Sequence, residues 1–141
     1  MRVLFIVPYP IEGASNRLRV EQYLPYLKIN GIEYKVRHFV SEAFYNILYR
    51  DGYYFLKLFY FIISTFNRLI DVILAFKYDV IFIHREAYPV GPPLFEYIFF
   101  KLNKPLIYDF DDAIFLPNTS KVNSFIERFK NPRKIIKIIK L

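Results

Sequence analysis

Short apolar runs alternate along the chain with longer segments of helical periodicity, and this alternation most limits the possible folds. Residues 3–7 are a continuous apolar run, residues 79–83 and 105–108 are mostly apolar, and residues 34–40 have the composition of a further strand. Runs of this kind are typical of strands buried on both faces, and helices between them supply the crossovers of a parallel sheet. The sequence therefore predicts an α/β fold, a parallel sheet with helices on both faces.

Composition favours one folded domain. The chain has 141 residues, of which 55% are hydrophobic and 23% charged, which argues against disorder. It contains no Cys, so disulfides and thiolate metal sites are excluded. No signal peptide is evident, because Met1 and Arg2 lead directly into a strand. We therefore expect a single domain over residues 1–141, located in the cytoplasm.

Positive charge is concentrated near the C-terminus. Residues 125–141 carry a net +5 of the total +7. A basic, Ile-rich segment is suited to contact with anionic lipid, whereas no recognised nucleic-acid motif accompanies the charge. Nucleic acid is therefore not an expected partner.

Residues 53–76 are apolar enough to raise the question of a membrane span. Lys57 and Arg68 leave only ten uncharged residues between them, however, whereas a span needs about 20. Lys57, Ser64, Arg68 and Asp71 also share one stripe at helical spacing, opposite apolar residues. The pattern predicts an amphipathic helix packed on the sheet, with peripheral membrane contact as the alternative.

The remaining helices are predicted from caps and breakers. Ser15 is expected to cap a helix that ends at Gly31, with a kink at Pro25. A last helix or helix pair is expected from about residue 118 to the terminus, broken near Pro132.

Three segments follow predicted strands and should converge at one edge of the sheet. They are residues 8–19, 84–86 and 109–112. Ligands of parallel sheets bind at the carboxyl ends of the strands, so this edge is the candidate site. It combines the cations Arg17, Arg19 and Arg85 with the acids Glu86, Asp109, Asp111 and Asp112, a mixture suited to a polar substrate with hydroxyl and phosphate groups.

The three aspartates are the densest ionisable cluster in the chain. Neighbouring carboxylates repel one another and burial raises their pKa values, so such a cluster persists only beside cations, water or a ligand. The simpler interpretation is a solvated helix cap. Similarly, His84 has the alternative of a hydrogen-bonded structural role, and Arg19 could pair with Glu86 or Glu12.

Four segments together resemble the N-terminal half of GT-B glycosyltransferases of family 4. They are residues 3–8, 13–19, 79–86 and 108–114. The resemblance implies a Rossmann-like, acceptor-side domain whose C-terminal, donor-binding domain is absent. It further implies a retaining transferase without metal or cofactor, with a nucleotide sugar as co-substrate. A cell-surface glycan or lipid-linked acceptor would receive the sugar, in the cytoplasm or at the inner membrane face.

The resemblance also implies roles for individual residues. Asp109 or Asp111 would orient the acceptor hydroxyl or the donor sugar, and Arg85 would keep these carboxylates ionised. Backbone N–H groups at Gly13 and Ala14, reinforced by Arg17, would stabilise the leaving phosphate. The other expected substrate contacts are Arg19, His84, Glu86 and Asp112.

Other functions remain open. The strand followed by Asp109-x-Asp111 resembles that of Mg²⁺-dependent phosphatases of the haloacid dehalogenase type, although there the motif follows the first strand of the domain. An Asp-x-Asp metal site of GT-A transferases is a weaker alternative for the same reason. The chain could also be a sugar- or lipid-binding module without catalysis. As an isolated half it is expected to transfer no sugar and to expose apolar surface.

Overall fold

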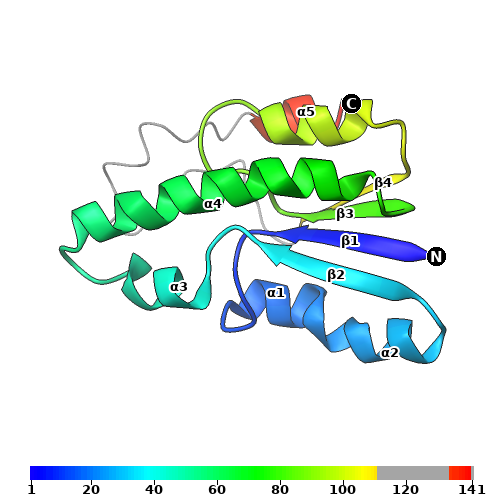
Figure 1. The fold of residues 1–141 in the computed structure, drawn as a ribbon, viewed down its shortest axis with the longest axis horizontal. Coiled ribbons are helices and arrows are strands. Elements are labelled where there is room, and N and C mark those ends of the chain that lie inside the picture. Colours follow the sequence, from blue (N-terminus) through cyan, green and yellow to red (C-terminus); the bar gives the residue numbers. More distant parts are fainter. Residues whose placement is uncertain (111–133, 141) are drawn as a thin grey trace.

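Four parallel strands form one sheet in the order β2-β1-β3-β4 in this computed structural model, which describes residues 1–110 and 134–140 (Figure 1). The strands are β1 (Arg2–Val7), β2 (Glu33–His38), β3 (Val80–His84) and β4 (Leu106–Asp109). In the register, Val7 lies opposite His38 and His84 lies opposite Asp109. All carboxyl ends therefore meet at one edge. The predicted α/β, Rossmann-like parallel sheet with helices on both faces is confirmed.

One face of the sheet is covered by the segment between β1 and β2. Val3, Phe5 and Val7 point to this side, and they form a core with Val20 and Leu24. Alternate residues of β1 therefore serve one face, as expected for a strand buried on both sides. The covering elements are α1 (Ala14–Arg19), the 3₁₀ turn η1 (Glu21–Tyr23) and α2 (Leu24–Ile29).

The single kinked helix predicted for this segment is wrong in two details. Pro25 lies in the first turn of a separate helix, α2, where its missing N–H group interrupts no helical hydrogen bond. Ser15 is not the cap of α1, because Gly13 occupies the N-cap position and no side chain caps the helix. Ser15 is the second residue of α1, and its side chain reaches the carboxyl end of β3.

The opposite face is covered by α4 (Tyr54–Ala75) and α5 (Leu94–Lys101). The core on this side contains Leu4, Ile6, Ile81 and Ile83 from the central strands. The preceding helix, α3 (Glu42–Leu48), begins at Ser41, whose side chain accepts a hydrogen bond from the Phe44 backbone N–H at 3.2 Å. The last described helix is α7 (Lys134–Ile138), in the segment expected to be helical. The expected beginning of that segment near residue 118 and its expected break near Pro132 lie outside the described residues.

Helix α4 packs on the sheet as predicted, but it does so with its polar stripe. Ser64, Arg68 and Asp71 are buried, whereas Phe55 is 91% exposed and Phe66 is 64% exposed. An amphipathic helix ordinarily buries its apolar side. Here the polar side meets backbone and charged groups at the ends of β1 and β2, which explains the reversal.

The contacts of Arg68 determine this orientation. Its guanidinium donates to the Val7 carbonyl at 3.2 Å and to Asp71 at 3.0 Å, and Arg37 on β2 donates to the other oxygen of Asp71. Burial lowers the pKa of Arg68 to about 10, against the opposing effect of Asp71, so the residue stays charged at neutral pH. Among the described residues, α4 is also the one helix long and apolar enough to cross a membrane, a criterion that core helices of soluble proteins also meet.

Candidate functional site

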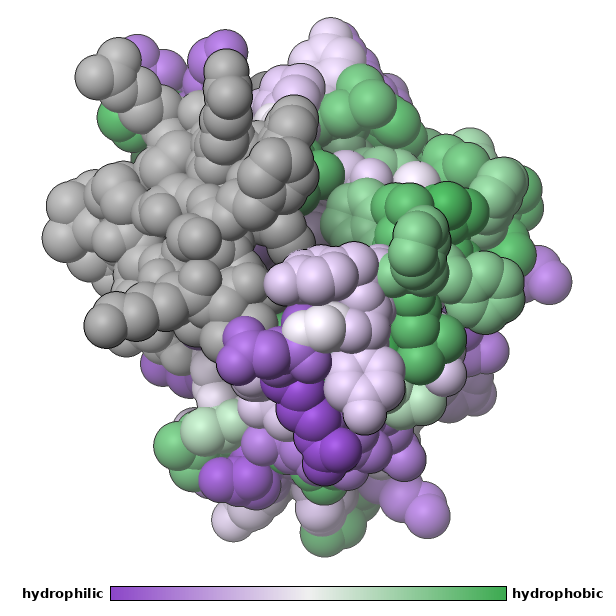
Figure 2. Space-filling model, turned by 90° about the vertical axis from the view of Figure 1, so that its left-hand side faces the viewer, coloured by the Kyte–Doolittle hydropathy of each residue, from purple (hydrophilic) through white to green (hydrophobic). Residues whose placement is uncertain are grey.

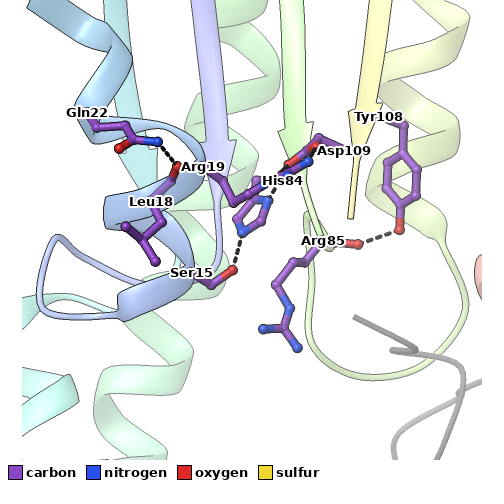
Figure 3. A network of polar contacts seen from close by, with 8 residues as sticks. All are labelled: Ser15, Leu18, Arg19, Gln22, His84, Arg85, Tyr108 and Asp109. Atoms are coloured by element: carbon purple, nitrogen blue, oxygen red, sulfur yellow. Dashed lines mark hydrogen bonds and ion pairs between the residues drawn. The ribbon is translucent and has the colours of Figure 1, made fainter. Parts of the chain in front are cut away.

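A polar cluster lies at the carboxyl ends of β1, β3 and β4. Ser15 and Arg19 come from α1, His84 ends β3 and Asp109 ends β4 (Figure 3). The connections from β1 and β3 run to opposite sides of the sheet, since β2 and β4 are its outer strands. In open α/β sheets, ligands bind in the crevice at such a change of direction. The cluster therefore lies at the place where a ligand is expected.

Three of these side chains form a hydrogen-bonded chain. The Ser15 Oγ lies 2.7 Å from His84 Nε2, and His84 Nδ1 lies 2.8 Å from Asp109 Oδ2. His84 is completely buried. In the neutral imidazole, a carboxylate at Nδ1 places the proton on that nitrogen, so Nε2 accepts a hydrogen bond from the Ser15 hydroxyl. The Asp109 carboxylate thereby holds His84 in this tautomer, and His84 orients the Ser15 hydroxyl.

Asp109 is held in its ionised form. Its burial opposes ionisation, but the hydrogen bonds from Arg19 and His84, together with the positive charge of Arg19, outweigh burial and lower the pKa of the carboxyl group. Arg19 Nε donates to Oδ2 at 3.2 Å, and Arg19 Nη2 bonds to Oδ1. The sequence predicted that the aspartates would persist only beside cations, water or a ligand, and Asp109 does lie beside the cation Arg19.

The cations differ from those expected. Arg19 pairs with Asp109 and not with Glu86 or Glu12, so at Asp109 it supplies the positive charge that was expected from Arg85. The reason is the short α1, which carries Arg19 over the crevice to the end of β4, 90 residues further along the chain. The expected contact of Arg85 with Asp111 lies outside the described residues.

Arg85 follows His84 in a left-handed backbone conformation, with φ of 61°. Its N–H donates to the Asp109 carbonyl at 2.7 Å, and its own carbonyl accepts a bond from the Tyr108 hydroxyl. Such a conformation is unfavourable for a residue with a Cβ and persists where neighbouring contacts impose it. These bonds fix the backbone from which the Arg85 side chain extends beyond the sheet edge, on the side of Ser15 (Figure 3).

Gly13 is required by close packing in the loop after β1. A Cβ at this position would lie 2.7 Å from the Tyr9 Cβ and 3.2 Å from the Pro10 carbonyl oxygen. The Gly13 N–H also donates to that oxygen at 2.9 Å. Ala14 and Arg17, the other predicted residues of this loop, are exposed on α1. Their expected contact with a phosphate stays a prediction.

Glu86 points to a different partner. Its carboxylate lies 2.6 Å from the Nζ of the buried Lys134, which also donates to the Tyr88 carbonyl. This contact connects α7 to the loop after β3. Asp111 and Asp112, predicted as catalytic and substrate-binding residues, lie outside the described residues.

Sequence reasoning missed the position of Ser15 in this site. It was expected as a helix cap, although it lies in one of the three segments that were predicted to converge. The sequence does contain a signal for this role: Ser15 follows β1, and it therefore lies at the same edge of the sheet as His84, which ends β3. Tyr108 was also missed; burial raises its pKa, so its hydroxyl stays protonated and can donate to the Arg85 carbonyl.

The described residues bring together no group of three or more His, Cys, Asp or Glu side chains that could hold a metal ion. What the cluster offers is a serine hydroxyl in a fixed orientation, flanked by arginines. Such groups recognise hydroxyl-rich or anionic ligands.

No protein family model, no curated protein and no solved structure matches this chain.

Proposed function

We propose that this chain is the N-terminal, acceptor-side part of a GT-B glycosyltransferase that moves a sugar from a nucleotide-sugar donor to a cell-surface glycan or glycolipid on the cytoplasmic side of the membrane. The observation that carries the proposal is the Ser15–His84–Asp109 chain at the crevice between β1 and β3. Three of the segments that resemble family 4 transferases converge there. Their polar side chains suit a saccharide, which is recognised through its hydroxyl groups.

In this proposal Ser15 and Arg85 contact the substrates. With its proton directed to His84, the Ser15 hydroxyl can accept a hydrogen bond from an acceptor hydroxyl. Arg85, on its fixed backbone, is suited to an anionic group such as a phosphate. The donor sugar and its nucleotide would be bound by a second domain. Asp111 and Asp112 remain proposed substrate contacts, because in the sequence they come two and three residues after the end of β4.

Asp109 acts in this proposal through His84. Both of its carboxylate oxygens accept bonds from Arg19 or His84, so it positions the imidazole and does not itself meet the acceptor. The same occupancy disfavours the phosphatase alternative, in which Asp109 would be a nucleophile with a free oxygen beside Mg²⁺. That alternative predicts Mg²⁺-dependent phosphatase activity that disappears in Asp109→Asn.

A second candidate function follows from the order Ser15–His84–Asp109, which is that of the triad in serine hydrolases. There, an uncompensated aspartate stabilises the imidazolium that forms when the serine attacks. In this protein Arg19 already neutralises Asp109, which weakens the imidazole as a base. Labelling of wild type but not Ser15→Ala by a fluorophosphonate probe would favour the hydrolase over the transferase.

The proposal is tested by NMR titration of the ¹⁵N-labelled, 141-residue chain with short saccharides and water-soluble lipid-linked saccharides. We expect shifts of the amide signals of Ser15 and Arg85, and their loss in Ser15→Ala and Arg85→Ala. Arg50→Ala, which removes an exposed arginine elsewhere, is the matched control. Absence of shifts at the crevice with every saccharide would refute acceptor binding. Turnover of a nucleotide sugar by this chain alone would refute the proposed division of labour between two domains.

A further inference from the structure

The loop after β3, residues 85–88, is held by a lysine of α7. Lys134 Nζ lies 2.6 Å from the Glu86 carboxylate and also donates a hydrogen bond to the Tyr88 carbonyl. The lysine is only 4% exposed, so its charge is shielded from water and depends on these contacts. Lys134 therefore joins the C-terminal helix to the loop that contains Arg85.

A second carboxylate holds the same loop from α5. Glu96 is fully buried, and its Oε1 accepts a hydrogen bond from the Ala87 N–H at 2.9 Å. Its Oε2 has no hydrogen-bond partner among the described residues. Burial raises the pKa of this carboxyl group, and the nearby charge of Lys134 opposes that effect. Lys134 thus compensates one carboxylate in the loop and another on α5.

Arg85 is the first residue of this loop. Its left-handed backbone is held on the β4 side by the Asp109 carbonyl and the Tyr108 hydroxyl. On the other side the next residue, Glu86, bonds through its side chain to Lys134. A backbone conformation of this kind persists only where neighbouring contacts impose it. The direction of the Arg85 side chain therefore depends on α7 as well as on β4.

The side of the molecule at which the strands end is accessible to a polar ligand. Hydrophilic side chains are exposed there (Figure 2). Arg85 extends beyond the sheet edge on the side of Ser15 (Figure 3). Lys134 is too buried to meet a ligand on this surface, so it can act on binding only through the loop.

We propose that Lys134 is a positioning residue for anion binding at the crevice: through Glu86 it fixes the loop so that Arg85 meets a phosphate group of a phosphorylated saccharide. This inference rests on the proposed function and adds α7 as an element that sets the affinity for the phosphate. A lysine that only anchored α7 would, when lost, weaken every ligand equally or none. A lysine that positions Arg85 should, when lost, weaken the charged ligand alone.

The test compares two ligands that share one sugar, glucose 1-phosphate and methyl α-glucoside, in NMR titrations of the ¹⁵N-labelled, 141-residue chain. The amide signal of Ser15 reports the sugar, and the side-chain Nε–H signal of Arg85 reports the phosphate. In Lys134→Met the dissociation constant should rise about tenfold or more for glucose 1-phosphate, the size of one charged hydrogen bond, and change by less than about twofold for methyl α-glucoside. Lys137→Met, which removes an exposed lysine of the same helix, is the matched control and should change neither.

Glu86→Gln tests the same contact from its other end. It leaves the buried Ile135 and Ile138 of α7 in place. Removing a negative charge near Arg85 would by itself strengthen anion binding, so weaker binding of glucose 1-phosphate in Glu86→Gln identifies an effect of position and not of charge. Circular dichroism checks that each variant is folded, and if Lys134→Met does not fold, Glu86→Gln decides.

Three results would overturn the inference and leave the proposed function standing. Equal weakening of both ligands in Lys134→Met would show that the lysine only stabilises the fold. An unchanged constant for glucose 1-phosphate would show that Arg85 does not need Lys134. Tighter binding of glucose 1-phosphate in Glu86→Gln would reveal a through-space effect of charge. By contrast, a wild-type chain without shifts at Ser15 or Arg85 for either ligand would count against the proposed function and overturn the inference with it.

Discussion

Replacement of Asp71 by alanine should strongly destabilise the fold, because it breaks the ion pair that fixes α4 on the sheet. Asp71 is the only carboxylate that bonds to Arg68 in the described structure, and both side chains are 1% exposed. After the substitution Arg68 would retain two backbone carbonyls, while its Nε already has no partner among the described residues. A buried guanidinium would thus lose its counter-charge.

The magnitude follows from this burial. Removing one partner of a buried ion pair costs about 3–5 kcal/mol, because the remaining charge is not compensated. Arg37, the second partner, is about a quarter exposed and adds little, on the order of 1 kcal/mol or less. Domains of this size have a free energy of unfolding of roughly 5–15 kcal/mol, so Asp71→Ala would remove a large part of it.

Urea unfolding followed by circular dichroism measures the effect. With an m-value of about 2 kcal/mol per molar, a loss of about 4 kcal/mol moves the midpoint by about 2 M. Asp79→Ala is the matched control: Asp79 pairs with Arg2 at an exposed site, and its loss should move the midpoint far less. Arg68→Met/Asp71→Leu should recover most of the loss, since an apolar pair leaves no buried charge. A shift for Asp71→Ala no larger than that of Asp79→Ala would refute the reasoning.

Three further predictions concern the crevice. The lowered pKa of Asp109 adds stability that is present above its unfolded pKa of about 4 and is lost as pH falls through the folded value. Asp109→Asn should therefore destabilise the protein more at pH about 7 than at pH about 3. Urea unfolding at both pH values checks this, and an effect of equal size at both would contradict it. Gly13→Ala should cost about 1–3 kcal/mol, because the new Cβ meets the Tyr9 Cβ at 2.7 Å; an unchanged thermal midpoint would show that the loop adapts. Arg85→Gly should abolish saccharide shifts in the NMR titration, because it removes the side chain proposed to meet the ligand while glycine keeps a φ of 61° without strain; shifts that persist in this variant would contradict the proposed contact.

Much of the fold was predictable because its signals are local. A continuous apolar run such as residues 3–7 specifies a strand that is buried on both faces, whatever its neighbours. The helices after β1 were harder, since Pro25 is equally compatible with a kink inside one helix and with the first turn of another. Local preference alone could not separate these two outcomes.

The candidate site was predictable at the level of segments and not of pairs. Residues after parallel strands must meet at one edge, so the segments containing Ser15, His84 and Asp109 were expected to converge. The cation that reaches Asp109 depends on the length and direction of α1. The spacing of residues in the sequence does not encode how far α1 carries Arg19 across the sheet edge. For this reason Arg19, and not Arg85, is its partner.

By itself the sequence determined the α/β class, the parallel sheet and the edge that carries the polar residues, because hydrophobic periodicity and chain connectivity act locally. Only the tertiary structure decided that α4 turns its polar stripe inward. Periodicity reveals that a helix has two sides, but the side that is buried depends on the groups it meets, and here those groups are the carbonyls and the arginine at the ends of β1 and β2. The exposed aromatic surface is a consequence of those contacts.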